Sequence, residues 1–183
     1  EHRTTLTGFK WIARVPDLVF GYEEAIGYCC DPAHVRDKDG ITAAVTMAVL
    51  VDSLRIDGRT IQDVLDSFAD RFGLHATAPV TFRVEDVGLI SAAMQQLRST
   101  APAELAGSEV VSVIDLNEGY DGLPPTDGLM LFTAANDRVI IRPSGTEPKL
   151  KCYLEVILPG GTWEEAHKRL DAIGEELRGV IGL

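Results

Sequence analysis

The sequence predicts two successive units: an α/β fragment, then an α+β domain in which an antiparallel sheet is packed by two helices. Residues 41–55 and 61–72 carry two consecutive helical patterns with few intervening residues. Residues 150–156 alternate apolar and polar side chains, the period of a half-buried strand. Residues 162–180 begin with a capping pattern and carry one apolar stripe, as expected for a helix lying on a sheet. We place the domain boundary between residues 75 and 76.

The composition predicts a folded protein that does not act mainly on nucleic acid or membranes. Hydrophobic residues make up 45% and charged residues 25%, and the net charge is −11. Such an acidic chain is repelled by nucleic acid and by anionic membranes. The longest apolar run, residues 41–51, is too short to span a bilayer, and no signal peptide is evident. The three cysteines fit no metal-ligand spacing and predict reduced thiols in a cytoplasmic protein.

The first unit, residues 1–75, reads as a strand, a loop and two helices. Residues 18–20 predict a short strand that leads into a glycine-bounded loop at residues 21–27. Asp39 is placed to cap the helix at residues 41–55, which is apolar on more than one face and is therefore predicted to be buried between layers. The second helix, at residues 61–72, follows a Thr60–Asp63 capping pattern, and its apolar stripe consists of Ile61, Leu65, Phe68 and Phe72.

The second unit, residues 76–183, reads as a sheet of four or five strands with two helices. Residues 74–79 are interpreted as a linker into it. The predicted strands are residues 80–84, 110–116, 129–132, 139–141 and 150–156, and the predicted helices are residues 88–98 and the segment from Thr162. A hairpin turn is predicted at residues 135–137, where Ala-Asn-Asp provides turn-forming side chains.

Residues 142–149, Arg-Pro-Ser-Gly-Thr-Glu-Pro-Lys, form the most informative stretch. They lie between two predicted strands, which would hold a tight loop rigidly. An arginine fork can bind two phosphate oxygens, hydroxyls and glycine-flanked amides add neutral donors, and a lysine adds a point charge. The groups come from Arg142, Ser144, Gly145, Thr146 and Lys149. An ordinary hairpin turn is the alternative, but two flanking cations in so acidic a chain favour a phosphate site.

This stretch resembles the phosphate-binding loop in the last domain of the α-D-phosphohexomutases, the phosphoglucomutase and phosphomannomutase superfamily. The resemblance implies that the five residues hold the non-reacting phosphate of a phosphosugar. It also extends over nearly the whole chain, with the end of the third domain followed by the fourth. The chain begins at Glu1 without an initiator methionine, and we expect it to be a fragment, a processed chain or a trimmed form.

Residues 21–27, Gly-Tyr-Glu-Glu-Ala-Ile-Gly, resemble the sugar-recognition loop of the family's third domain. From the residues alone, Glu23 and Glu24 could be two solvated acids on a turn, or one could bind sugar hydroxyls while the other braces the loop. The resemblance favours the second interpretation. Ala25 stands where many members have serine, which leaves the hexose preference open. This form of the loop is similar to the branch that includes phosphopentomutases and glucose bisphosphate synthases, and to some bacterial phosphomannomutase-type enzymes.

Two neighbouring stretches resemble other parts of the same sugar site. Residues 34–40 are similar to the loop before the following helix, and Lys38 matches a lysine near the reacting phosphate or the sugar. Residues 5–10 resemble another third-domain loop at the active-site cleft. Through this resemblance Thr7, Gly8 and Lys10 are predicted to contact the sugar.

The sequence contains neither the family's phosphoserine loop nor its Asp-x-Asp-x-Asp-Arg-type loop for Mg²⁺. By resemblance, the parent enzyme is an intramolecular phosphotransferase: it moves a phosphoryl group between C1 and C6 of a hexose through a hexose 1,6-bisphosphate. We expect no catalytic residue and no metal ligand in this chain. We therefore expect it to bind phosphosugar without turnover when it is separated from the N-terminal domains of the same polypeptide.

Three alternatives stay open at the level of sequence. The parent could be a phosphopentomutase or a glucose-1,6-bisphosphate synthase-type enzyme instead of a hexose mutase. The chain could also be a stand-alone module that binds phosphosugar without catalysis, or a purely structural domain. In each case the first unit lacks the opening strands of its α/β layer. We therefore expect a bare apolar face and self-association of the fragment.

Overall fold

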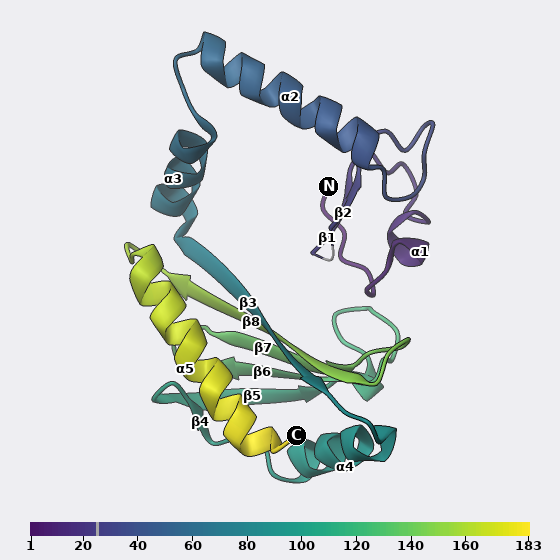
Figure 1. Ribbon diagram of the computed structural model, residues 1–183, viewed down its shortest axis with the longest axis vertical. Helices are drawn as coiled ribbons and strands as arrows, with labels where there is room; N and C mark the ends of the chain where they lie inside the picture. The colour runs from purple at the N-terminus through teal and green to yellow at the C-terminus, as the bar shows by residue number, and fades with distance from the viewer. Residues whose placement is uncertain (25) are drawn as a thin grey trace. The chain divides into compact units, whose positions relative to one another are not determined.

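The computed structural model describes residues 1–24 and 26–183, which divide into two compact units, Glu1–Leu65 and Asp66–Leu183 (Figure 1). The elements of the first unit are α1 (Phe9–Ile12), β1 (Gly21–Glu23), β2 (Gly27–Cys29) and α2 (Gly40–Ile56). The boundary falls within α3 (Ile61–Phe72). The second unit continues with β3 (Leu74–Arg83), α4 (Val87–Ser99), β4 (Glu104–Leu105), β5 (Ser108–Asp115), β6 (Leu129–Thr133), β7 (Arg138–Pro143), β8 (Lys149–Leu158) and α5 (Trp163–Ile181), with a 3-10 turn at Leu116–Glu118.

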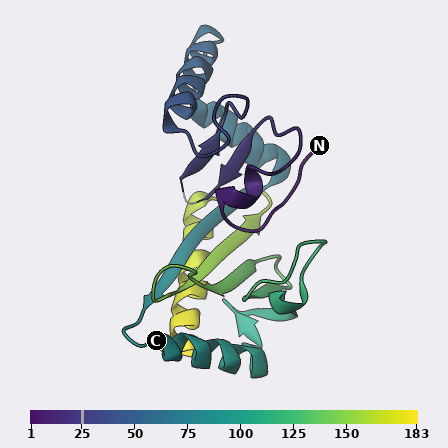
Figure 2. The same cartoon turned by 90° about the vertical axis from the view of Figure 1, so that its right-hand side faces the viewer.

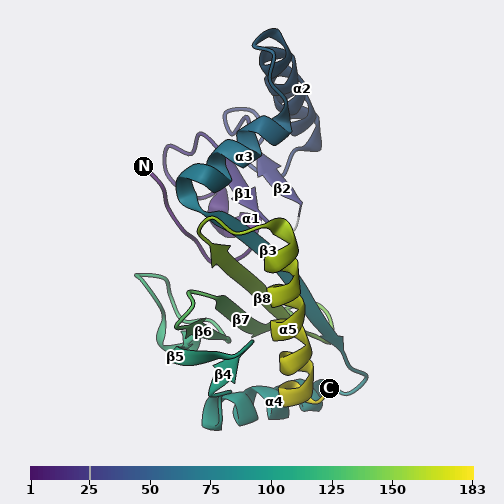
Figure 3. The ribbon, with the colours of Figure 1, turned by 90° about the vertical axis from the view of Figure 1, so that its left-hand side faces the viewer.

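The second unit is an antiparallel sheet of six strands in the order β3-β8-β7-β6-β5-β4, which confirms the predicted α+β architecture with more strands than expected. Figure 3 shows α5 running across the sheet, and in Figure 2, a view from the opposite side, α5 lies behind the strands. The apolar residues of α4 and α5 join those of the strands in one core. The sheet therefore has one covered face and one open face.

Strand β8 lies next to the β3 edge and is paired on both sides. It pairs with β3 from Leu74↔Leu158 to Arg83↔Lys149, and with β7 from Arg138↔Glu155 to Pro143↔Leu150. Its covered face carries the buried residues Leu150, Cys152, Leu154 and Val156, which confirms the predicted alternation. Burial raises the pKa of the Cys152 thiol to about 12, so this thiol is neutral at physiological pH.

The predicted helix starts are confirmed by their caps. Asp39 accepts hydrogen bonds from the amides of Ile41 and Thr42 at the start of α2. A full capping box joins Thr162 and Glu165 at the start of α5. In each case a side-chain oxygen satisfies an amide that the first helical turn leaves without a partner.

Two predictions from the sequence are wrong. Residues 18–20 are not a strand, because the chain first becomes extended at Gly21, where β1 and β2 pair as a hairpin. Residues 21–23 and 27–29 therefore form a β-hairpin, where a loop was expected. Residues 74–79 are not a linker but the first part of β3. The strand was missed because Pro79 is typical of a linker. The sheet tolerates this proline because β3 is an edge strand, where an amide hydrogen can be absent without loss of a hydrogen bond between strands.

The prediction that α2 is buried between layers is also wrong for this chain. Within α2 only Leu54 is buried, while Ile41 is 78% and Val49 is 65% exposed. The stripe on α3 is exposed as well. The described part of the first unit has only a small core around Phe9 and Cys29, which is too small to cover both helices. No helix in the part of the chain that the structure describes is long and apolar enough to cross a membrane.

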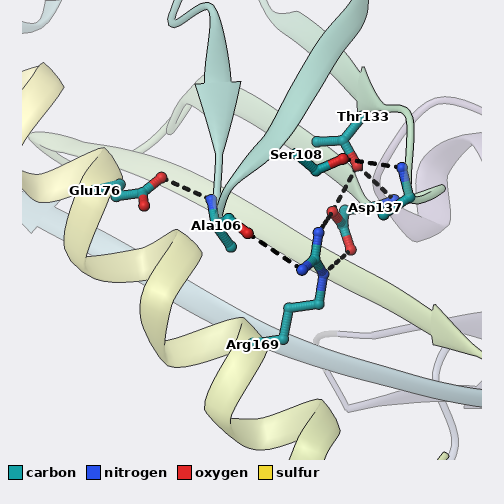
Figure 4. Close-up of polar contacts among 7 residues, drawn as sticks. Ala106, Ser108, Thr133, Asp137, Arg169 and Glu176 are labelled. Carbon is teal, nitrogen blue, oxygen red and sulfur yellow. Dashed lines mark hydrogen bonds and ion pairs between the residues drawn. The ribbon is translucent and has the colours of Figure 1, made fainter.

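A buried ion pair ties α5 to the sheet (Figure 4). Asp137, 1% exposed, accepts two hydrogen bonds from the Arg169 guanidinium, at 2.7 and 2.6 Å, and one from the Thr133 hydroxyl at 2.5 Å. Arg169 also donates to the Ala106 carbonyl at 3.3 Å, and the Ala106 amide donates to Glu176 at 2.8 Å. The helix is thereby joined to both hairpins of the β4–β7 region.

We predict that Arg169→Ala destabilises the second unit by about 3 kcal/mol or more, since it leaves the Asp137 carboxylate buried and unpaired. Urea unfolding followed by Trp163 fluorescence, in a Trp11→Phe background, measures this unit alone. Lys168→Ala is the matched control, because Lys168 is exposed on the same helix and its loss is expected to change stability by less than about 0.5 kcal/mol. Equal effects of the two substitutions would contradict the role of the pair.

Candidate functional site

The predicted phosphate loop is the connection between β7 and β8. Residues 144–148 lie outside both strands, and the Ser144 amide donates to the Lys149 carbonyl at 2.8 Å across the base of the loop. On the other side of β8, the Val84 amide donates to the Pro148 carbonyl at 3.1 Å. The loop is thus held by β7 on one side and by the end of β3 on the other.

Most donors of this loop have no partner among the described residues. The half-buried Arg142 guanidinium makes no hydrogen bond or ion pair there, nor do the hydroxyls of Ser144 and Thr146. The amides of Gly145 and Thr146 are likewise unused within the described chain. The structure therefore brings a guanidinium group, two hydroxyls and two free amides together on one short loop. These are the hydrogen-bond donors that suit a phosphate dianion.

Lys149 differs from the other predicted phosphate ligands. Its side chain is only 11% exposed, and its ammonium is ion-paired with the Glu147 carboxylate of the same loop. That hydrogen bond with Lys149, aided by the positive charges of Arg83 and Lys151, lowers the pKa of Glu147. Sequence reasoning did not single out Glu147, Arg83 or Lys151. Position in the sequence pattern could have indicated Lys151, because it is one of the polar residues that alternate with apolar residues along β8.

The predicted sugar-binding residues Glu23 and Glu24 belong to the β1–β2 hairpin of the first unit. The hairpin packs against α1 so closely that a Cβ atom at Gly27 would lie 2.7 Å from the Phe9 ring and 2.6 Å from the Glu23 side chain. At Gly21 a Cβ atom would lie 2.7 Å from Ile12. The two glycines that bound the motif are thus needed for close packing.

The two glutamates of the hairpin have different surroundings. Glu23 has a side chain that is 10% exposed and pairs with the Lys38 ammonium at 2.5 Å. Lys38 also lies 5.8 Å from the centre of the Phe9 ring. Glu24 is exposed, and its backbone carbonyl accepts a hydrogen bond from the Ile26 amide at 2.8 Å. The structure therefore brings Glu23 and Lys38 together and leaves the Glu24 carboxylate in solvent.

The remaining predicted sugar contacts lie around α1. Gly8 precedes the helix with φ 112°, a conformation that favours glycine. Thr7 and Lys10 are exposed, and the Lys10 ammonium lies 5.5 Å from the centre of the Trp11 ring. Within the described residues, no hydrogen bond or ion pair joins Thr7 or Lys10 to Glu23 or Lys38. Ala25, where the family often has serine, lies outside the described residues.

Neither a metal site nor a surface depression adds to the predicted site in the described structure. Across residues 1–24 and 26–183, no three His, Cys, Asp or Glu side chains are grouped so that they could hold a metal ion. A depression of about 780 Å³ follows the outer face of α5, and it contains none of the predicted site residues. Its lining comes from that single helix: Glu164, His167, Lys168, Asp171, Ala172 and Glu175.

Comparison with protein families gives two matches that follow each other along the chain. Residues 1–72 match "Phosphoglucomutase/phosphomannomutase, alpha/beta/alpha domain III". Residues 89–159 match "Phosphoglucomutase/phosphomannomutase, C-terminal domain", which includes the whole phosphate loop.

Relatives with curated names include a probable phosphomannomutase of Haemophilus influenzae, 40% identical over 99% of this chain and 36% of its own length. A phosphopentomutase of Mus musculus is 34% identical over 97% of this chain and 32% of its own length. A glucose 1,6-bisphosphate synthase of Mus musculus is 30% identical over 93% of this chain and 32% of its own length. The chain thus spans about a third of the length of these relatives.

A solved structure supports the fold. The exocytosis-sensitive phosphoprotein pp63/parafusin (phosphoglucomutase) from Paramecium, in an open form, superposes with a TM-score of 0.62 at 17% identity. The match covers 87% of this chain and 29% of that one. At this level of identity the comparison speaks for the fold alone.

We predict that Gly27→Ala destabilises the hairpin of the first unit by about 1–3 kcal/mol, because the added methyl overlaps Phe9 and Glu23. Trp11 fluorescence during thermal unfolding, in a Trp163→Phe background, follows this unit. Gly40→Ala is the control, since a Cβ atom there meets nothing within 4 Å. If Gly27→Ala melts at the temperature of the control, the close packing does not matter to stability.

Proposed function

Because the chain belongs to the phosphoglucomutase/phosphomannomutase family, we propose that it is the phosphosugar-binding part of a phosphohexomutase. The parent enzyme would interconvert a sugar 1-phosphate and a sugar 6-phosphate. In this proposal the second unit holds the phosphate that does not react, and the first unit reads the sugar hydroxyls. The names phosphomannomutase and phosphopentomutase among the relatives support a mutase reaction.

The unpaired Arg142 guanidinium is the observation that carries the proposal. A half-buried arginine without an anionic partner in the described structure lowers the stability of the fold. Carboxylates are abundant in this chain, with 28 against 17 lysines and arginines, so the lack of a partner calls for an explanation. It is best explained by a ligand that supplies the anion. The planar fork suits two oxygens of one phosphate, and Ser144, Gly145, Thr146 and Lys149 offer the further donors.

The proposed sugar-binding role rests on the hairpin of the first unit. The Glu23–Lys38 pair offers an acceptor and a donor held in fixed relation, which suits adjacent hydroxyl groups of a sugar. Glu24 offers a solvated carboxylate beside it. Thr7, Gly8 and Lys10 complete the proposed contacts, although no hydrogen bond or ion pair among the described residues joins them to this pair.

In phosphoryl transfer the protein contributes mostly position and electrostatic stabilisation. The described residues would contribute position, by holding one end of the sugar. We propose that the phosphoserine and Mg²⁺ belong to N-terminal domains of the parent polypeptide, with hexose 1,6-bisphosphate as the intermediate. A cytoplasmic location and self-association through the exposed faces of α2 and α3 are further parts of this proposal.

A pentose or bisphosphate chemistry is the second candidate. The relatives named phosphopentomutase and glucose 1,6-bisphosphate synthase support it, as does the Gly-Tyr-Glu-Glu-Ala-Ile-Gly form of the hairpin. Competition titrations with ribose 5-phosphate and glucose 6-phosphate would distinguish the sugars. A stand-alone phosphosugar-binding module remains the alternative outside catalysis.

We predict that the chain binds glucose 1,6-bisphosphate with millimolar or tighter affinity and that Arg142→Ala weakens binding at least tenfold. The loss corresponds to about 1.4 kcal/mol or more, within the range for hydrogen bonds to charged groups. Isothermal titration calorimetry measures both proteins. Arg138→Ala is the matched control, since Arg138 lies on the same strand and is paired with Glu155 at 2.8 Å. Equal weakening by the two substitutions would mean that only net charge matters.

We also predict that the purified 183-residue chain shows no mutase activity at saturating sugar phosphate. The groups that transfer the phosphoryl group would be supplied by other domains. A coupled assay with glucose 1-phosphate, Mg²⁺ and glucose 1,6-bisphosphate tests this. Turnover that scales with the concentration of this chain would contradict the proposal that other domains supply the groups that transfer the phosphoryl group.

A further inference from the structure

Four cationic side chains gather on the open face of the sheet around the phosphate loop. The strand register places Arg83 directly opposite Lys149 and Lys151 directly opposite Arg142. Lys149 and Lys151 are two residues apart on β8 and so share one face. Cross-strand pairs of like charge destabilise a sheet unless an anion lies between them. The arrangement therefore requires a counter-ion.

Within the described structure, the carboxylate that meets this requirement is Glu147. It is ion-paired with Lys149, whose nearly buried ammonium needs a partner. The positive charges of Arg83 and Lys151 also favour its ionised form. Its backbone carbonyl accepts a hydrogen bond from the Lys149 amide at 2.7 Å, which holds the two residues together. Arg142, in contrast, has no anion among the described residues.

We propose that Glu147 is an internal counter-ion that selects for phosphate: its carboxylate occupies Lys149 in the ligand-free loop, and a bound phosphate must displace it. This inference rests on the proposed phosphate-binding function. Arg142 would receive the incoming phosphate first, because its guanidinium is free. Lys149 would bind the phosphate only after the Glu147 carboxylate has been displaced from its ammonium. Glu147 is thus a specificity-determining residue that acts through Lys149.

The exchange explains why the loop would prefer phosphate to other anions. A carboxylate from the same loop competes at a high effective concentration. A ligand with a single negative charge, such as the carboxylate of a hexuronic acid, is too weak a competitor. A phosphate dianion carries more charge and three acceptor oxygens, so it can engage Arg142 and Lys149 together.

Calorimetric titration of the full 183-residue chain tests the proposal with two probes, glucose 1,6-bisphosphate and glucuronate. We expect Glu147→Gln to tighten binding of the bisphosphate about five- to tenfold and to make glucuronate binding measurable. Glu109→Gln removes the same charge from an exposed site in the same unit, and it should change neither affinity by more than about twofold. Adding Lys149→Met to Glu147→Gln should abolish the gain.

The outcomes separate this inference from the proposed function. If Arg142→Ala abolishes bisphosphate binding while Glu147→Gln leaves both affinities unchanged or weaker, the phosphate site stands and the counter-ion role is wrong. If the gain survives in the Glu147→Gln/Lys149→Met double variant, Glu147 does not act through Lys149 and the inference is also wrong. If neither the unaltered chain nor any variant, Glu147→Gln included, binds the bisphosphate, both proposals are wrong. A circular-dichroism spectrum of Glu147→Gln that matches that of the unaltered chain at the titration temperature shows that the fold is intact.

Discussion

The pairing of β8 with a strand on each side is the constraint on which the candidate site depends. Lys149, Lys151 and their opposite residues Arg83 and Arg142 take their places from the register of β3, β8 and β7. The covered face of β8 is locked by the core with α4 and α5, so a shift by one residue would expose that core and bury the charges. The Asp137–Arg169 pair adds a second anchor between α5 and the β6–β7 turn. The phosphate loop therefore begins and ends on rigid strands.

Much of the second unit could be predicted from the sequence, because its signals are local. The alternation in β8, the capping box at Thr162 and the turn before Asp137 depend only on near neighbours. Strand β3 was missed because Pro79 signals a linker locally, and only the sheet order makes it an edge strand. The Glu147–Lys149 pair lies within the recognised motif but depends on the path of the loop. Arg83 enters the site through a strand pairing over some 66 positions, from Arg83 to Lys149, which a single sequence does not reveal.

The first unit shows the opposite balance. Helix α2 and helix α3, which begins in this unit, were predicted correctly from periodicity and caps, but their burial was not. Burial depends on what packs against a helix, and the described residues of this unit supply only a small core. The glycines of the hairpin could be recognised from the motif, whereas their reason, close packing against Phe9 and Ile12, is visible only in the structure. Family resemblance predicted candidate site residues more specifically than spacing alone could.

The central claim is that the β7–β8 loop binds the phosphate of a phosphosugar. Two-dimensional NMR of the ¹⁵N-labelled chain during titration with glucose 1,6-bisphosphate tests it most directly, because each amide reports separately. The account predicts that the largest shifts fall on the amides of Gly145 and Thr146 and on the Arg142 side chain. Shifts that leave residues 142–149 unchanged and fall instead on the outer face of α5, around His167 and Asp171, would contradict it.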